Sequence, residues 1–517
     1  MREFIQKNTV LSISLTIILL FVIFGAFFNE LLELWVNYFL DTTVEYFGWF
    51  YLTATLVFLF MAILLIFSRY GKIRLGKDTD RPVYSRMSWI AMLFSAGMGI
   101  GLVFWGVAEP LFHYMTPPFG DAATADAANT AMTYTYFHWG LHPWAIYTII
   151  GLSLAFFQYR KNLPGLISST FYPLIGDRIY GPIGKGIDVL AIFATVFGIA
   201  TSLGLGTLQI AGGLSYLFDV PNVVSTQIII IAAVTVLFAG SAVIGINKGM
   251  KILSNFNILL ALGLMLLLLF LGPTSQIFKV FTSTSGSYLD DVLYMSLRIR
   301  PFGDNSWIAG WTLFYWAWWI AWAPFVGSFI AKVSKGRTIK EFILGVLFIP
   351  TVGTFVWFSV FGGTSLHLVH NMGNTALAEA ATADVAEALF VFFQYFPFST
   401  ALSVIAVILV VSFFVTSADS STFVLSVFSS NGNLNPTRKL KLTWGCLLSL
   451  VSIVLLLSGS LETLQSASIA AAFPFTIIMS VMCYSLLKGL ILEHGKIQNH
   501  PTPKESNIQE NKHKEVM

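Results

Sequence analysis

The sequence has little charge and almost no cysteine. Only 11% of its 517 residues are charged and 56% are hydrophobic, whereas soluble globular chains carry roughly a quarter charged residues. The net charge of +3 is too small to indicate a nucleic-acid partner. The two cysteines, Cys446 and Cys483, form neither a disulfide framework nor a metal-binding spacing. These shortages exclude a soluble globular protein, and no polar stretch is long enough for an enzyme domain.

Apolar runs of about twenty residues recur along the whole chain, which predicts an all-α polytopic membrane protein. The first run has no small-residue cleavage site, so we expect it to be a membrane span rather than a signal peptide. Twelve transmembrane helices are predicted, at about 9–28, 45–68, 88–113, 131–158, 187–216, 223–244, 252–272, 308–331, 340–367, 398–428, 440–459 and 464–491.

Lysine and arginine indicate the orientation in the membrane. They gather in the even-numbered turns, and none occurs between Met87 and Tyr159. The exceptions, Lys279, Arg298 and Arg300, lie in the long turn before the eighth span. By the positive-inside rule both termini are predicted to be cytoplasmic, which agrees with the even number of spans.

The order of apolar spans and polar segments divides the chain into five parts. Residues 285–301 are too polar to span and predict an amphipathic helix at the outer surface. The mixed charges after residue 492 predict a disordered cytoplasmic tail. The expected parts are an N-terminal pair of peripheral spans (1–86), a first five-helix unit (87–275), an outer amphipathic connector (276–305), a second five-helix unit (306–492) and the tail (493–517).

Five tryptophans lie close together in residues 311–329. Several are three or four residues apart, so the rings run along the middle of a helix rather than forming a belt at its end. Indole faces are the best side-chain partners for a permanent organic cation. The stretch therefore predicts a quaternary ammonium site, with an interfacial belt or plain packing as the alternative. Pro324 and Gly327 predict an interruption of this helix. The five are Trp311, Trp316, Trp318, Trp319 and Trp322.

The third span carries Gly97, Gly99 and Gly101 at alternate positions. Glycine at every second position favours local unwinding, although the four-residue spacing of Gly97 and Gly101 also suits close helix packing. Two interrupted helices, in the third and eighth spans, would occupy corresponding places in two halves. That arrangement predicts a transporter site near the bilayer midplane.

The tenth span contains a run of hydroxyl side chains around Asp419. Thr416 and Ser417 offer oxygen ligands that suit Na⁺, since hard cations prefer oxygen. The alternative is that these hydroxyls bond back to their own helix.

The fourth span carries Trp139, Trp144 and Tyr147, which at helical spacing could line one side of a pocket. His138 and His142 are four residues apart, the spacing of a metal pair. No third ligand is evident, so structural histidines are favoured.

Four motifs carry a resemblance to a known family. They are Trp-Ala-Trp-Trp followed by Pro-Phe-Val-Gly, Gly-Met-Gly-Ile-Gly, His-Trp-Gly-Leu-His-Pro-Trp-Ala-Ile-Tyr, and Thr-Ser-Ala-Asp-Ser. Together they make the chain resemble the betaine/carnitine/choline transporter family, with the core of the match from about Ser88 to Thr422. The resemblance implies a sodium-symporter-type core of five plus five inverted-repeat helices behind two extra N-terminal helices. It also implies a homotrimer in the cell (plasma) membrane.

The resemblance assigns the substrate site. Trp139, Trp144, Tyr147 and Trp319 would form an aromatic box around a trimethylammonium group, and Trp322 would close its cytoplasmic side. Choline carriers of the family tend to place an aspartate at the last glycine of the third-span motif. Gly101 therefore favours the zwitterion glycine betaine, with carnitine and proline betaine as alternatives. The substrate-binding glycines would be Gly97, Gly99 and Gly101.

The resemblance also assigns sodium sites. One site would use the hydroxyls of Thr416 and Ser417 with backbone carbonyls from two spans. A second site would use Thr195, although its expected partner position is Ile199, which has no side-chain oxygen. Sodium-independent exchangers fill the ion region with a cation or a methionine, where this chain has Val326. The backbone ligands of the first site would be Ser95, Met98 and Phe413.

These observations predict a secondary active transporter, not an enzyme, that imports a trimethylammonium osmolyte by Na⁺ symport with alternating access. No cofactor is expected besides Na⁺ as the coupling ion. The alternatives are a sodium-independent carnitine/betaine exchanger and a proton-coupled choline carrier. A membrane enzyme would need a metal or nucleophile set, and the eight histidines offer only His138 and His142 at a suitable spacing.

Overall fold

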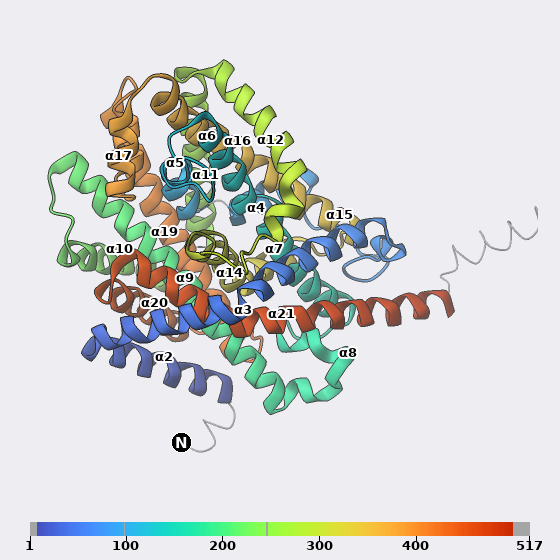
Figure 1. Cartoon of the computed structure of the whole chain (residues 1–517). Helices are drawn as coiled ribbons and strands as arrows, with labels where there is room; N and C mark the ends of the chain where they lie inside the picture. The colour runs from blue at the N-terminus through green and yellow to red at the C-terminus, as the bar shows by residue number, and fades with distance from the viewer. Residues whose placement is uncertain (1–7, 98, 245–246, 500–517) are drawn as a thin grey trace, which may run out of the picture.

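The computed structural model describes residues 8–97, 99–244 and 247–499 (Figure 1). Within these ranges the chain is helical and its β-structure is limited to an isolated bridge between Arg74 and Thr338. The all-α class predicted from the sequence is confirmed.

Ten helical segments of the described residues are long and apolar enough to cross a membrane. The two other predicted spans, 88–113 and 223–244, correspond to shorter apolar helices. Twelve crossings and the inverted repeat therefore stay predictions. The ten are Thr9–Phe27 (α2), Asn29–Phe67 (α3), Ala125–Arg160 (with α6, Ala125–Trp139, and α7, Leu141–Ala155), Pro182–Phe218 (α9), Ile252–Leu271 (in α11, Asn247–Leu271), Ser306–Val333 (with α14, Phe314–Val333), Ile339–Asn371 (with α16, Ile349–Leu366), Ser399–Ser429 (α19), Arg438–Leu457 (α20) and Leu461–Lys496 (in α21, Ser460–Asn499).

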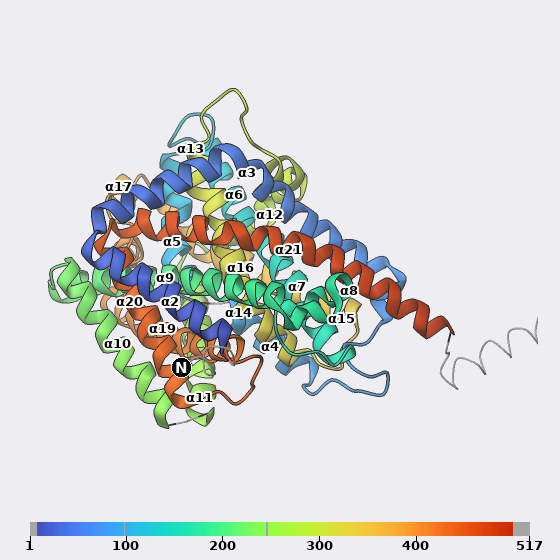
Figure 2. The same ribbon diagram turned by 90° about the horizontal axis from the view of Figure 1, so that it is seen from below.

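Burial separates an inner group of helices from an outer one. In their most apolar windows, 94% of the residues are buried in 125–160, 89% in α9 and 83% in 306–333, against 28% in α2 and 22% in 252–271. A helix that is apolar all round and buried belongs to the protein core, whereas an equally apolar exposed helix faces lipid. Helix α14 packs against α7, α9 and α21, and α21 runs alongside α3 across one face (Figure 2). The tryptophan-rich helix therefore lies at the centre of the bundle.

The predicted unwinding of the third span is confirmed. Helix α4 (Arg86–Gly97) ends at the first glycine of the motif, and α5 (Ile100–Met115) begins within it and contains Gly101. Gly99 between them is extended, with φ −152° and ψ −163°. The first N–H groups of a helix have no partners within it; in α5 the N–H of Leu102 donates to the carbonyl oxygen of Gly99 at 3.2 Å. Met98 lies outside the described residues, and of Ser95 and Gly97 only the helical backbone is described.

The predicted interruption at Pro324 and Gly327 is wrong. Helix α14 is continuous from Phe314 to Val333, with Pro324 inside it. Proline removes one backbone hydrogen bond, which a helix packed inside a membrane protein tolerates. Gly327 instead permits close packing, because a Cβ atom there would lie 2.4 Å from Ile150 Cγ2 in α7. The irregular part is a π turn at Ala309–Leu313, before α14 begins.

We expect Gly327→Val to destabilise the protein by about 1–3 kcal/mol, because the added methyl groups would overpack the contact between α7 and α14. Thermal unfolding of the purified protein in detergent measures this loss. Gly263→Val is the matched control, since a Cβ atom at Gly263 in α11 meets nothing within 4 Å. Equal melting temperatures for the two variants would contradict the packing role of Gly327.

Two polar segments differ from their predicted structure. The outer connector is a helix, α12 (Thr274–Ser296). It begins eleven residues before the start of the predicted amphipathic segment, 285–301, and ends five residues before the end of that segment. The tail predicted to be disordered from residue 493 instead continues α21 as far as Asn499. Glu493 explains this extension, because its carboxylate accepts a 2.6 Å bond from Arg160 Nε and pairs with Lys161.

Candidate substrate and ion site

The helix predicted over 131–158 is broken at Gly140, a break that the sequence analysis missed. Helix α6 ends at Trp139 and α7 begins at Leu141. A Cβ atom at Gly140 would lie 2.5 Å from the carbonyl oxygen of Tyr136, so the bend requires glycine. Pro143 is accommodated in the first turn of α7, where it costs no hydrogen bond. The closely spaced glycine and proline were the available signal.

The four predicted box residues come together from three helices. Trp139 ends α6, Trp144 and Tyr147 lie on α7, and Trp319 lies on α14. The ring centroids of Trp139 and Trp319 are 5.0 Å apart at 79°, and those of Tyr147 and Trp319 are 6.0 Å apart at 85°. Trp144 and Tyr147 meet at 5.7 Å and 77°. Neighbouring rings thus meet near right angles, as the walls of a box do, and all four are buried.

Hydrogen bonds fix the indole rings at this centre. Trp319 Nε1 donates to the carbonyl oxygen of His138 at 3.1 Å, and Trp139 Nε1 donates to Glu109 Oε2 at 2.7 Å. Trp322 Nε1 donates to the carbonyl oxygen of Gly198 at 2.7 Å. Each of these buried indole N–H groups therefore has its hydrogen-bond partner, which holds the ring in one orientation.

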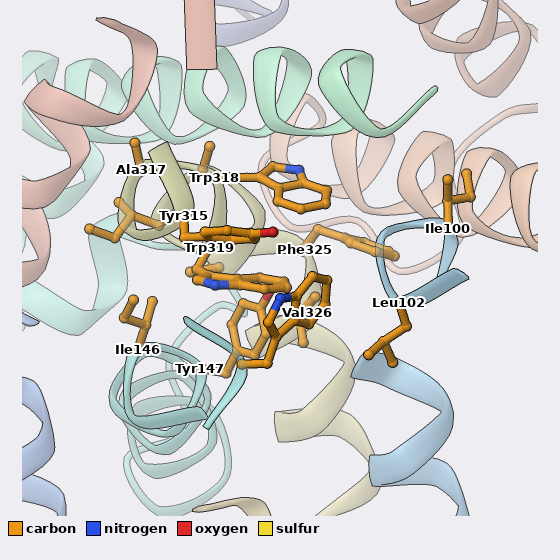
Figure 3. Close-up of a cluster of buried hydrophobic side chains, with 14 of the residues drawn as sticks. Ile100, Leu102, Ile146, Tyr147, Tyr315, Ala317, Trp318, Trp319, Phe325 and Val326 are labelled. Carbon is orange, nitrogen blue, oxygen red and sulfur yellow. The ribbon is translucent and has the colours of Figure 1, made fainter. Parts of the chain in front are cut away.

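The rings of Trp318 and Tyr315 pack against Trp319, one of the four box residues (Figure 3). Trp318 and Trp319 stack at 5.1 Å and 18°, and Tyr315 stacks with Trp319 at 21°. Trp316 points elsewhere and stacks on His142 at 5.1 Å. Trp311 packs against Trp105 at 5.3 Å. The tryptophan stretch therefore contributes Trp319 to the four predicted box residues, while Trp311 and Trp316 pack against other rings.

A small cavity lies between the box and the broken third span. Its volume is about 20 Å³, room for only one or two water molecules. A Cβ atom at Gly101 would lie 2.5 Å from Trp318 Cη2 and 3.0 Å from Trp139 Cη2. Gly101 therefore borders the ring space directly. The lining residues are Gly99, Ile100, Gly101, Leu102, Trp139, Ser202, Trp318, Trp319 and Trp322.

A second cavity, of about 100 Å³, shares Gly99 and Trp322 with the first. It brings together three of the predicted sodium ligands, Phe413, Thr416 and Ser417. Its other lining residues are Ser254, Asn257, Phe325, Val326, Phe329 and Ser420.

Asn257 of α11 is a candidate ion ligand that sequence reasoning missed. Its Nδ2 donates to Thr416 Oγ1 at 3.2 Å, while its Oδ1 is buried and has no hydrogen-bond partner. A buried oxygen without a donor is costly unless a cation or water binds it. A polar residue inside an apolar span was the available signal.

The hydroxyls of α19 donate mainly to carbonyl oxygens of their own helix. Thr416 Oγ1 donates to the carbonyl oxygen of Ser412 at 3.0 Å, and Ser421 and Thr422 do the same to Ala418 and Asp419. Of the hydroxyl run, Thr416, Ser417 and Ser420 line the cavity.

Thr195, predicted for the second sodium site, is buried in α9. Its hydroxyl donates to the carbonyl oxygen of Ala191 at 2.7 Å. It lines neither of the two cavities beside the box.

Glu109 is the second residue that sequence reasoning missed. It lies on α5, fully buried behind the box, and contacts His113, His138, Trp139 and Tyr315. A carboxylate inside an apolar span was signal enough. The two histidines noted as a possible metal pair separate here, because His138 turns to Glu109 while His142 bonds Ser296.

Comparison with known proteins identifies the family. The sequence profile of betaine/carnitine/choline family transporters matches residues 9–495. The chain belongs to this family. It is therefore a membrane transporter, not an enzyme, as the sequence predicted.

Similar family members are named for two kinds of substrate. The chain is 47% identical over 492 residues to a probable glycine betaine transporter of Desulfitobacterium hafniense, covering 95% of this chain and 98% of the relative. It is 50% identical over 455 residues to the glycine betaine transporter OpuD of Bacillus subtilis, covering 87% and 88%. It is also 43% identical over 494 residues to an ectoine/hydroxyectoine transporter of Virgibacillus pantothenticus, covering 95% and 98%.

Proposed function

We propose that this transporter imports glycine betaine by sodium symport with alternating access. The observation that carries the proposal is the shared wall between the aromatic box and the oxygen-lined cavity. Gly99 and Trp322 line both spaces. An ion bound in one cavity therefore touches the same residues that shape the other.

The box suits a trimethylammonium group. Such a group has no N–H to satisfy, and it presents a fixed charge inside a methyl surface. Ring faces favour both, by about 2 kcal/mol or more for a desolvated cation–π contact. The N-terminus of α5 lines the same cavity through Gly99, Ile100 and Gly101. Unpaired N–H groups and the positive end of a helix favour an anion, so this end suits the carboxylate of betaine.

The second cavity suits Na⁺. The hydroxyls of Thr416 and Ser417, the backbone of Phe413 and the unpaired Oδ1 of Asn257 all offer oxygen, the ligand type that hard cations prefer. We add Asn257 to the ligands predicted from the resemblance. The site at Thr195 stays a weaker proposal, since that residue lines neither of the two cavities beside the box.

Alternating access requires the box to open for substrate entry and Trp322 to move for substrate release. The box is closed here, with room for only one or two waters, so betaine entry requires the rings to separate from α5. Trp322 stands between the box and the ion cavity and must swing for release. Betaine is electrically neutral overall, so each coupled Na⁺ carries one charge and draws about 2.3 kcal/mol per 100 mV from the membrane potential.

The setting follows from the same proposal. We place the protein in the cell membrane with both termini cytoplasmic, as the lysine and arginine distribution favours. A homotrimer is proposed from the family resemblance. Import driven by sodium would accumulate betaine as an osmoprotectant.

The test is uptake of labelled glycine betaine into proteoliposomes. We expect uptake with an inward sodium gradient and little when potassium replaces sodium. Equal uptake in both, rising when betaine is preloaded inside, would identify an exchanger. Uptake that follows a proton gradient and prefers choline would identify a proton-coupled choline carrier. Either result would overturn the symport proposal.

Ectoine is a second candidate substrate, favoured by the similarity to the ectoine/hydroxyectoine transporter. Its identity of 43% is close to the 42% shared with the glycine betaine transporter of Acinetobacter baylyi. Overall identity therefore does not separate the two substrates. Competition of unlabelled ectoine against labelled betaine ranks them, and the box predicts betaine as the tighter ligand.

Gly101→Asp is expected to admit choline and to weaken betaine binding by about tenfold, because a carboxylate attracts the choline cation but repels the betaine carboxylate. Uptake of both labelled compounds measures the switch. Gly101→Ala separates charge from size, since its Cβ atom alone crowds Trp318. Choline uptake by the alanine variant, or normal betaine uptake by the aspartate variant, would contradict the carboxylate argument.

A further inference from the structure

Glu109 lies within hydrogen-bonding distance of four side chains at once. Its Oε1 is 3.2 Å from His113 Nε2 and 2.8 Å from His138 Nδ1. Its Oε2 is 2.7 Å from Trp139 Nε1 and 2.6 Å from the hydroxyl of Tyr315. Two carboxylate oxygens offer about four acceptor sites, and four donors fill them.

This geometry fits an ionised carboxylate. Indole N–H only donates, and 2.6 Å is a typical distance for an O–H donor on a charged oxygen. Thr312 Oγ1 lies 3.0 Å from His138 Nε2, which leaves that nitrogen to accept if Nδ1 donates. All four partners are then neutral. The buried anion is satisfied by hydrogen bonds but has no opposite charge among them.

The network supports two walls of the aromatic box. Glu109 holds the indole of Trp139 directly, and the backbone of His138 holds that of Trp319. Tyr315 packs against both Trp318 and Trp319, with ring centroids 6.2 Å and 6.3 Å away (Figure 3). The negative charge therefore lies immediately behind rings whose faces would receive a cation.

We propose that Glu109 is the buried counter-charge of the substrate site. It positions Trp139 and Tyr315, and its charge makes the box prefer a cationic head group over a neutral one of the same shape. Electron density on an indole rises when its N–H donates to an anion, and the anion also attracts the ammonium through the ring. This inference rests on the proposed betaine function.

A metal site is the competing interpretation of the same residues. Ligand atoms of Glu109, His113 and His138 lie within 4.8 Å of one another, all buried. However, Oε1 already accepts from both histidines, and Oε2 is taken by Trp139 and Tyr315. A metal would displace these bonds, so the hydrogen-bond network is the better account.

The test compares two ligands of one shape on the purified protein. Glycine betaine and tert-butylacetate differ only in the atom that carries the three methyl groups, nitrogen or carbon. Dissociation constants come from quenching of tryptophan fluorescence. Glu109→Gln keeps the length and an oxygen acceptor but removes the charge. We expect it to weaken betaine binding about tenfold and tert-butylacetate binding by less than about twofold.

Three controls make the comparison decisive. Asp188→Asn neutralises another buried carboxylate, one bonded only to Ser168, and should leave both affinities unchanged. Glu109→Leu removes both charge and support, and should weaken both ligands. Glu109→Asp keeps the charge, so the ratio of the two affinities should stay within about twofold of wild type even where both fall.

The outcomes separate this inference from the proposed function. Equal losses of both ligands in Glu109→Gln would make Glu109 merely structural, and unchanged betaine binding would remove it from the site. Either result overturns the inference. If Glu109→Gln does not assemble, Glu109→Asp provides the test. A loss of the preference for betaine over tert-butylacetate in that variant, which keeps the charge, overturns the inference as well. Failure of the wild-type protein to bind betaine would overturn the proposed function itself.

Discussion

Replacing Trp319 by leucine is expected to abolish glycine betaine binding while the protein still assembles. Trp319 contacts two other box residues, Trp139 and Tyr147, through its ring. Its loss removes a face that receives the ammonium and leaves the His138 carbonyl without its donor. Together these effects predict a rise in the dissociation constant of at least about a hundredfold, or roughly 3 kcal/mol. Tryptophan fluorescence titration or equilibrium dialysis measures it.

Trp316→Leu is the matched control for that variant. Trp316 lies on the same helix and is equally buried, but it stacks on His142 rather than on the box. We expect it to lower thermal stability while betaine affinity changes by less than about threefold. Similar affinities in the two variants would reduce the tryptophan stretch to packing.

Removing the two hydroxyls predicted to bind sodium, in the double variant Thr416→Val with Ser417→Ala, is expected to weaken sodium-driven uptake strongly. The change leaves Asn257 Oδ1, backbone oxygens and the hydroxyls of Ser254 and Ser420 in the cavity lining, a poorer set of oxygen ligands for a hard cation. The sodium concentration for half-maximal uptake should rise by at least about tenfold, or about 1.4 kcal/mol. A sodium titration of betaine uptake in proteoliposomes measures this.

Ser421→Ala provides the control, because that hydroxyl is bonded to Ala418 and does not line the cavity. Its sodium dependence should match wild type. If the double variant also keeps the wild-type sodium response, the ion is bound elsewhere and the assignment to α19 fails.

Much of the site could be predicted from local chemistry. The alternating glycines correctly predicted the break between α4 and α5, because glycine weakens a helix wherever it stands. The box residues came from ring type and helical spacing, with their roles supplied by the family resemblance. Such inferences depend on a few neighbouring residues, so one sequence suffices for them.

The errors concern contacts between distant segments. Pro324 appeared to interrupt a helix, yet the surrounding bundle keeps α14 continuous. Gly327 is explained by Ile150 on another helix, which no spacing along α14 reveals. The break at Gly140 is a local feature instead: a Cβ atom there would lie 2.5 Å from the carbonyl oxygen of Tyr136, and helix periodicity does not signal the bend.

Two site residues were missed for the same reason. Glu109 and Asn257 stood out in the sequence only as polar residues in apolar spans. Their importance depends on partners from other helices, namely Tyr315 for Glu109 and Thr416 for Asn257. Charge and polarity inside a membrane are thus visible in a sequence, while the group that satisfies them is not.

The most direct test of the account is the affinity of the purified protein for glycine betaine in sodium and in potassium at equal ionic strength. Gly99 and Trp322 border both the box and the ion cavity, so the two ligands should bind cooperatively. We predict that sodium lowers the betaine dissociation constant by at least about tenfold, and that betaine tightens sodium binding by the same factor, as linkage requires. Equal betaine affinity in the two salts would contradict the coupling of the two cavities.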